Sequence, residues 1–380
     1  MGDFSFPYRI IEGVNFINQV GEIVKDYGKR VVLIGDSLAA AETGWFPKIK
    51  AMIEDYALGV IAYDKVDNSS TSEIANKIAE EARFARSDVV IGFGGRNVLN
   101  IAKTVAFLIS HGGIIEDYFL GKKGQGKTVK YIEIPTTIGY LPGLTPDIQV
   151  IDKYDGIKKY LEANVYADVV IVDPKITTSL PDDFVRSIAL ETVAISIESF
   201  LSKKNNFITE TAGLKAIELV NLNLAKAIKD PENTVIKNNL CEAAILASMA
   251  LSFSSPGLSY AIGMAIKSIY NINQALAISI ILPYVMEFNL TTAANKLVFI
   301  TKAFGESIAD ISIVEAAIKA IENFRKLSIE NNIPQRLSEL NIENDDLVKI
   351  ARISRNYEFL HNLPRPVSRE DILTILTSAF

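Results

Sequence analysis

The sequence feature that most constrains the fold is a glycine-rich turn between an apolar run and a helical pattern. Residues 89–91 form a β-branched run typical of a buried strand. The run leads into Gly92, Gly94 and Gly95, and glycine permits a sharp turn and a close backbone approach. From Asn97 onward, apolar residues recur at helical spacing. The pattern predicts a strand, a tight turn and a helix whose free N–H groups face the turn.

A turn of this kind suits a phosphate group, because the amides and the positive end of the helix dipole converge on it. The alternative is a tight βα turn without a ligand, since a single glycine-rich turn is a weak motif. Asp36 follows an earlier apolar run, at the end of a predicted strand where doubly wound sheets bind ligands. Its carboxylate could accept a bond from a ribose hydroxyl and disfavour a 2′-phosphate, or it could be the N-cap of the next helix.

Strands and helices alternate in the first half of the chain and give way to helices in the second. Besides residues 89–91, strands are predicted at 30–37, 60–63, 131–134, 149–151 and 169–172, with helices at 14–27 and 71–85. This alternation is typical of an α/β domain with a mostly parallel sheet. Helical spacing then recurs at 184–201, 210–227, 233–253, 259–270, 275–288, 291–304, 311–327, 345–354 and 370–378. We place the boundary near Leu180-Pro181, between an α/β domain over 1–180 and an all-helical domain over 181–380.

Charge, cysteine content and hydropathy exclude several classes of protein. The net charge of −6, without a basic run, argues against a nucleic-acid partner. One cysteine, Cys241, cannot form an intramolecular disulfide or a zinc thiolate cluster. The N terminus lacks the apolar segment of a signal peptide, and Pro283 interrupts the apolar run 278–286, which is too short to span a bilayer. We expect a cytoplasmic protein that binds no membrane.

Several motifs together resemble the iron-containing alcohol dehydrogenases, which are related to dehydroquinate synthase and the glycerol dehydrogenases. The resemblance covers essentially the whole chain. The matching segments are the glycine-rich residues 94–103, the Pro-Thr-Thr strand end at 135–137 with Gly139, Asp-Pro at 173–174, Leu-Pro at 180–181, the Leu-Pro-Tyr-Val-Met-Glu-Phe-Asn run at 282–289, and the tail at 362–367.

The resemblance implies a dinucleotide-binding domain over 1–180, a helical domain over 181–380, an active site in the cleft between them, and a homodimer. It also implies NAD or NADP as the cofactor. The roles that it assigns to matching positions are Asp36 at the adenosine ribose, Gly94 and Gly95 at the pyrophosphate, Thr136 and Thr137 near the nucleotide, Asn97 at the position of the family's serine, and Lys158 or Lys159 at that of the family lysine before the last strand.

The chain departs from the family at the metal site. Family members hold a divalent metal with one aspartate and three histidines, the first two at i and i+4 on one helix face. The corresponding positions, including one further family histidine, are occupied here by Glu191, Ile195, Tyr260, Gln274 and Met264. Isoleucine cannot ligate a metal, and neutral glutamine and tyrosine oxygens are poor ligands. We therefore predict no metal at this site, and a substrate pocket lined by Glu191, Ile195, Met264 and Gln274.

The chain departs from the family on the cofactor side as well. Arg96 replaces the family's third glycine and Asn100 its aspartate, while residues 140–143 read Tyr-Leu-Pro-Gly in place of Thr-Gly-Ser-Glu. Arg96 adds bulk where the backbone should approach the phosphate closely, or it pairs with that phosphate itself. We expect a reshaped cleft.

Without a metal, the proton donor must be a side chain. Tyr260 is one candidate and Lys103 another, although tyrosine also fills cores and a helix lysine is commonly solvated. Glu191 and Glu198 share a helix face and could act together as general bases. For Glu198, the favoured alternative is a carboxylate exposed to solvent. Of the two histidines, His111 is expected to cap a helix, and His361 to face either the cleft or the surface.

Two functions follow from these residues and from the resemblance. The first is an NAD(P)-dependent oxidoreductase that acts on a small alcohol or carbonyl without the family's metal. The alternative is a non-catalytic homologue that binds a nucleotide or another small ligand, or that serves as a partner subunit. A lyase like dehydroquinate synthase is less favoured, because that enzyme also needs its metal.

Overall fold

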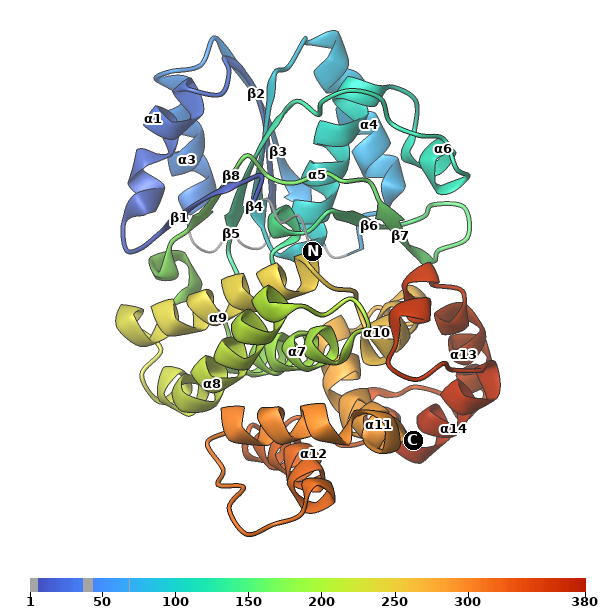
Figure 1. Cartoon of the computed structure of the whole chain (residues 1–380). Helices are drawn as coiled ribbons and strands as arrows, with labels where there is room; N and C mark the ends of the chain where they lie inside the picture. Colours follow the sequence, from blue (N-terminus) through green and yellow to red (C-terminus); the bar gives the residue numbers. More distant parts are fainter. Residues whose placement is uncertain (1–5, 37–43, 68) are drawn as a thin grey trace. The chain divides into compact units, whose positions relative to one another are not determined.

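The computed structural model describes residues 6–36, 44–67 and 69–380, and the chain divides into two compact units (Figure 1). Unit 1 comprises Met1–Thr137 and Leu141–Ser179, and unit 2 comprises Ile138–Tyr140 and Leu180–Phe380. The long segment of unit 2 begins at Leu180. The short excursion at residues 138–140 has no counterpart in the sequence prediction.

A parallel six-stranded sheet forms the centre of unit 1, with strand order β1-β8-β5-β4-β2-β3. The strands are β1 (Arg9–Glu12), β2 (Arg30–Asp36), β3 (Gly59–Val66), β4 (Val89–Gly94), β5 (Lys130–Pro135) and β8 (Val169–Val172). The helices are α1 (Val20–Lys25), α3 (Trp45–Glu54), α4 (Ser72–Phe84), α5 (Arg96–His111) and α6 (Ile115–Phe119). The α/β class is thereby confirmed. Strand β1, at the edge of the sheet, was not predicted.

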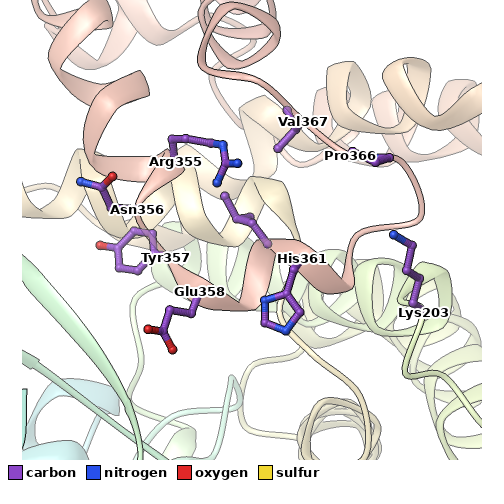
Figure 2. A pocket seen from close by; sticks show the side chains of 9 residues that line it. Lys203, Arg355, Asn356, Tyr357, Glu358, His361, Pro366 and Val367 are labelled. Atoms are coloured by element: carbon purple, nitrogen blue, oxygen red, sulfur yellow. The ribbon is translucent and has the colours of Figure 1, made fainter. Parts of the chain in front are cut away.

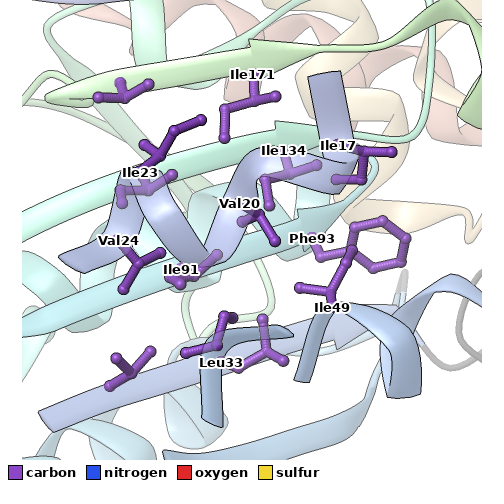
Figure 3. Packing of buried hydrophobic residues seen from close by; sticks show 14 of the residues in the cluster. Ile17, Val20, Ile23, Val24, Leu33, Ile49, Ile91, Phe93, Ile134 and Ile171 are labelled. Atoms are coloured by element: carbon purple, nitrogen blue, oxygen red, sulfur yellow. The ribbon is translucent and has the colours of Figure 1, made fainter. Parts of the chain in front are cut away.

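Alternate residues of the central strands point to opposite faces of the sheet. On one face, Leu33, Ile91, Phe93 and Ile134 pack against apolar residues of α1 and α3 (Figure 3). On the other face α5 lies so close that a Cβ atom at Gly92 would approach Ala102 Cβ to 2.9 Å. The strands are therefore buried on both faces, which explains why their sequences are almost continuously apolar.

The strand order places a topological switch between β2 and β4. From β2 the chain moves to β3 on one side, and it then crosses to β4 and β5 on the other side. In sheets of this kind, ligands bind outside the carboxyl ends of the strands at the switch. Asp36 ends β2 and Gly94 ends β4, so both lie at this edge.

Three predictions in unit 1 need correction or limits. Residues 149–151 belong to β6 (Asp147–Ile151), which pairs antiparallel with β7 (Lys158–Glu162) outside the main sheet. The helix predicted at 14–27 is shorter, with a 3₁₀ turn at Phe16–Gln19 before α1, because Asn15 is left-handed at φ 70°. Ser37, placed at the end of a predicted strand, lies outside the described residues, and so do the residues directly after Asp36 on which its alternative role as an N-cap depends.

Unit 2 is built from helices in the residues that the structure describes. They are α7 (Asp182–Leu201), α8 (Phe207–Lys229), α9 (Thr234–Ser252), α10 (Leu258–Ile269), α11 (Gln274–Ala303), α12 (Ile313–Glu330), α13 (Leu347–Arg355) and α14 (Arg369–Ala379). The two helices predicted at 275–288 and 291–304 are a single helix, α11. Asn289, at the expected break, bonds within the helix to the Val285 carbonyl (2.8 Å), and Pro283 is accommodated in the helix interior.

Helix α11 is the one candidate membrane span in the described part of the chain, by length and composition alone. Of its most apolar window, 61% is buried against other parts of the protein. Core helices of globular proteins meet the same criteria of length and composition.

Candidate functional site

The carboxyl ends of three neighbouring strands bring the predicted nucleotide residues of unit 1 together. The Thr136 amide donates to the Gly94 carbonyl across β5 and β4 (3.0 Å). A Cβ atom at Gly94 would lie 3.2 Å from Asp36 Cβ, and one at Gly95 would lie 3.5 Å from Thr137 Cγ2. Asp36, Gly94, Gly95, Thr136 and Thr137 thus form one cluster, which we call the strand-end cluster.

The two glycines of the cluster are present for different reasons. Gly94 is sterically required, because a Cβ atom there would approach Val98 Cβ to 2.9 Å. Gly95 is the N-cap of α5 and has an extended backbone at φ −84°, which any residue adopts. The Thr137 methyl is the one described atom within 4 Å of a Cβ atom at Gly95. The helix N terminus therefore faces a space that an added side chain would fill, and this fits a phosphate group.

The side chain of Asn97 serves the protein backbone. Its amide donates to the carbonyls of Asp67 (2.7 Å) and Ser70 (3.4 Å), and so ties the loop after β3 to the start of α5. Arg96 is the first residue of α5 and is partly exposed. The cofactor role assigned to Asn97 remains a prediction, and its observed bonds are structural.

Lys103 is fully buried. The alternative interpretation, in which it is a helix lysine exposed to solvent, is therefore wrong. Its ammonium donates to the carbonyls of Pro142 (2.8 Å) and Thr145 (2.7 Å), and also to that of Asp147. These bonds engage all three protons. Burial lowers the pKa of Lys103 to about 8, against the opposing effect of nearby carboxyl groups. A proton donor must reach its substrate, and this ammonium instead anchors the segment between β5 and β6.

Asn100 acts beside Lys103 in anchoring this segment. Its side chain donates to the Arg96 carbonyl (3.0 Å) and accepts from the Gln149 amide (2.9 Å). The residue that replaces the family's aspartate thus joins α5 to β6.

A buried carboxyl group on β5 was missed by the sequence reasoning. Glu133 is fully buried, and burial raises its pKa to about 7. The Tyr131 hydroxyl lies 2.8 Å from Glu133 Oε2 and 3.0 Å from the Leu99 carbonyl. The signal was available, because Glu133 stands between two isoleucines in a strand that the sequence predicts to be buried.

The two candidate lysines of β7 lie in different surroundings. Lys158, predicted to bind the cofactor, is buried at the start of β7 and pairs in the ladder with Ile151. Lys159 forms ion pairs with Asp152 (3.7 Å) and Asp155. The bonds of Lys159 hold the turn between β6 and β7, and the cofactor role of Lys158 remains a prediction.

The positions that we predict to correspond to the family's metal ligands lie in unit 2 and hold buried side chains. Glu191 and Ile195 are on α7, Tyr260 and Met264 on α10, and Gln274 is the first residue of α11. None of these five is more than 5% exposed. Among the described residues, no group of three or more His, Cys, Asp or Glu side chains is placed to hold a metal. With one carboxylate and no imidazole, this donor set does not fit the metal that the family name implies.

Glu198 is buried rather than solvated, which corrects the expectation from its sequence. Its carboxylate accepts from the backbone amides of Ser259 (2.7 Å) and Tyr260 (3.2 Å), at the start of α10. Burial raises the pKa of Glu198 to about 7, while these amide bonds favour the ionised form. The ring of Tyr260 also meets the ring of Tyr140 edge to face, with 6.3 Å between centroids.

Two surface cavities lie away from all of the predicted site residues. In unit 2, a cavity of about 540 Å³ is lined by residues that include Lys203, Arg355 and His361 (Figure 2). His361 is exposed there, as one of its two alternatives expected. In unit 1, a cavity of about 960 Å³ is lined by the loop before β5 and by His111, the last residue of α5. Neither cavity includes a residue of the strand-end cluster.

Comparison with known proteins gives matches over nearly the whole chain. Residues 7–174 match the family described as iron-containing alcohol dehydrogenase, and residues 189–380 match its C-terminal part. Alcohol dehydrogenase 4 of Saccharomyces cerevisiae is 27% identical over 99% of this chain and 98% of its own. A solved 1,3-propanediol oxidoreductase has a TM-score of 0.94 at 23% identity, covering 100% of both chains. The sulfoacetaldehyde reductase from Bifidobacterium kashiwanohense, solved with NAD⁺, has a TM-score of 0.86 at 21% identity, covering 100% of this chain and 98% of its own.

Proposed function

Because this chain belongs to the iron-containing alcohol dehydrogenase family, we propose that it is an oxidoreductase that interconverts a small alcohol and its carbonyl compound with NAD(H) or NADP(H). The observation that carries this proposal is the strand-end cluster at the topological switch of the unit 1 sheet. The NAD⁺ in the structure of the related sulfoacetaldehyde reductase supports the same class of cofactor.

The residues of the cluster suit the parts of a dinucleotide. The amides at the start of α5, beside Gly95, would bind the pyrophosphate, and the Asp36 carboxylate would accept from a ribose hydroxyl. Thr136 and Thr137 would border the nucleotide from the adjacent strand. Since a carboxylate at the ribose repels a 2′-phosphate, we propose that NAD(H) is preferred over NADP(H).

We propose further that the reaction proceeds without the family's metal. When bound, the nicotinamide supplies the hydride for carbonyl reduction, and the oxygen of the product then needs a proton. Of the two candidate donors, Lys103 has all three of its protons bonded to backbone carbonyls. We therefore assign the proton to the Tyr260 hydroxyl, which would donate it to the carbonyl oxygen in reduction and accept it back in oxidation.

The decisive experiment measures binding and turnover on the same preparation. Calorimetry with NADH and NADPH should give binding, tighter for NADH, and Asp36→Ala should narrow that difference at least about tenfold. Oxidation of NADH should then be followed against a panel of small aldehydes and ketones, with and without added Fe²⁺ or Zn²⁺. Turnover that does not depend on added metal, and that Tyr260→Phe abolishes, is the expected result.

Two other outcomes would point elsewhere. Tight nucleotide binding without turnover on any carbonyl would favour the non-catalytic homologue. Failure of both nucleotides to bind would overturn the proposed function altogether.

We propose in addition that the protein is a cytoplasmic homodimer that binds neither nucleic acid nor membrane. Light scattering of the purified protein measures its oligomeric state.

A further inference from the structure

We propose that Glu198 is a positioning residue for this reaction, holding the first turn of α10 and thereby fixing the place of Tyr260. The inference rests on the proposed function, because it takes Tyr260 as the proton donor. It concerns a carboxylate on α7 that the sequence reasoning expected to find in solvent.

The start of α10 is capped by a side chain from another helix. The first N–H groups of a helix lack partners within the helix, and a side chain of the N-cap residue ordinarily accepts from them. The N-cap of α10 is Gly257, which has no side chain to do so. The carboxylate of Glu198 takes that place from a different helix, with one oxygen on the Ser259 amide and the other on the Tyr260 amide.

Gly257 is explained by the same arrangement. Its backbone, at φ −103° and ψ −166°, is open to any residue, so conformation does not require glycine there. A Cβ atom at this position would, however, overlap the Glu198 carboxyl group and lie 2.7 Å from Glu198 Cβ. The absence of a side chain at residue 257 is therefore what admits the carboxylate.

The bond to Tyr260 has a direct consequence for the donor. Because Glu198 bonds to the amide of Tyr260 itself, it holds the backbone of that residue in place, while the ring of Tyr140 contacts the ring of Tyr260. A displacement of about 1 Å in a reacting group can lower the rate by about 100-fold. Loss of Glu198 should accordingly lower kcat and leave nucleotide binding unchanged.

The test uses two variants that disrupt the contact from opposite sides. Glu198→Gln keeps the shape of the side chain but offers one acceptor oxygen, and Gly257→Ala displaces the carboxylate sterically. The matched control is Glu116→Gln, which alters another buried carboxylate, in unit 1, bonded to Ser72 and Asn76. For each protein we would measure kcat and KM for carbonyl reduction, the Kd for NADH, and hydrogen exchange at the Ser259 and Tyr260 amides.

Both test variants should exchange the two amides at least about tenfold faster and lose about 10- to 100-fold in kcat, with the Kd for NADH within twofold of the wild type. The control should change neither exchange at these amides nor kcat. Faster exchange with unchanged kcat would overturn the positioning role, and unchanged exchange would overturn the contact itself. Should a variant fail to fold, the wild-type protein must still show slow exchange at both amides. If the wild type reduces no carbonyl, the proposed function has failed, and the exchange data report on the contact separately.

Discussion

Glu133 shows at the level of one residue how burial determines a protonation state. The Tyr131 hydroxyl has one proton but lies within bonding distance of two acceptors, Glu133 Oε2 and the Leu99 carbonyl. The bond that Tyr131 donates and the charge of Lys103 both favour an ionised Glu133, yet burial outweighs them and raises the pKa of Glu133 to about 7. The charged neighbours Lys103 and Asp147 are also buried, so a neutral Glu133 adds no further net charge to this interior.

We predict that this carboxyl group makes the protein less stable as the pH rises from about 4.5 to about 7. Over this range the unfolded chain releases the proton of Glu133, whose ordinary pKa is 4.5, while the folded protein retains it up to its raised pKa of about 7. The loss is about 3 kcal/mol and is complete above pH 7. Glu133→Gln cannot ionise, so urea denaturation should show it to be more stable than the wild type at pH 8 by up to this amount.

At pH 4, Glu133 is protonated in the folded and the unfolded protein, so the wild type and Glu133→Gln should be equally stable. Glu198, whose pKa is also raised to about 7, contributes the same sign of pH dependence to both proteins and cancels in the difference. A difference that does not vary with pH would show that the folded protein does not raise the pKa of Glu133.

At the scale of elements, the segment formed by β4, the turn and the start of α5 has one glycine that serves packing and another that we assign to ligand binding. A Cβ atom added at Gly94 would press against Val98 and Asp36, whereas one added at Gly95 would contact the Thr137 methyl and no other described atom. The same tight turn thus contains one glycine that the fold needs and one that we assign to the ligand.

We predict that alanine at Gly94 lowers stability, whereas alanine at Gly95 weakens nucleotide binding. Gly94→Ala should lower the free energy of unfolding by about 1–3 kcal/mol, because its Cβ atom enters a packed space. Gly95→Ala should leave stability within about 0.5 kcal/mol but weaken NADH binding about tenfold, because its Cβ atom occupies the space proposed for the pyrophosphate. Thermal unfolding and calorimetry measure the two effects. Gly59→Ala, which meets no atom within 4 Å, is the matched control, and NADH binding equal to the wild type in Gly95→Ala would place the nucleotide elsewhere.

The α7, α10 and α11 segments show how elements of the family fold can hold different chemistry. Each is helical, and the positions that we predict to correspond to the family's metal ligands hold residues of other types, all buried. Helix formation depends on apolar spacing and packing, which these residues satisfy as well as histidine does.

For the molecule as a whole, we predict folding that does not depend on a transition metal. Elemental analysis of the purified protein should find less than about 0.1 Fe or Zn per chain, and a chelator should leave the melting temperature unchanged, since no bound ion adds to stability. The matched variant restores Asp and His at the family positions, with Glu191→Asp, Ile195→His, Tyr260→His and Gln274→His, and it should gain binding of Zn²⁺ in calorimetry. Stoichiometric metal in the wild type would show that the donor set has been misjudged.

Local patterns in the sequence were enough to predict most of the elements and the class of the fold. Short apolar, β-branched runs identified five of the six strands of the main sheet, and the period of 3.6 residues identified, with small shifts of their ends, the helices of unit 2. They failed at β7 and at the pairing of β6, because whether a short apolar run joins one sheet or another depends on partners distant in the chain. They also divided α11 in two at residues 289–290, since a polar residue such as Asn289 resembles a boundary when the packing around it is unknown.

The sequence by itself determined the glycine-rich turn and the α/β and helical halves, because each of these depends on residue type and local spacing; the loss of the family's metal ligands stays a prediction. The tertiary structure alone decided that Lys103 is an internal anchor, that the Tyr131 hydroxyl beside Glu133 lies within bonding distance of the Leu99 carbonyl, and that Glu198 reaches the start of α10. Each of these depends on groups between 32 and 62 positions apart in the chain that folding brings within bonding distance, where burial then governs charge.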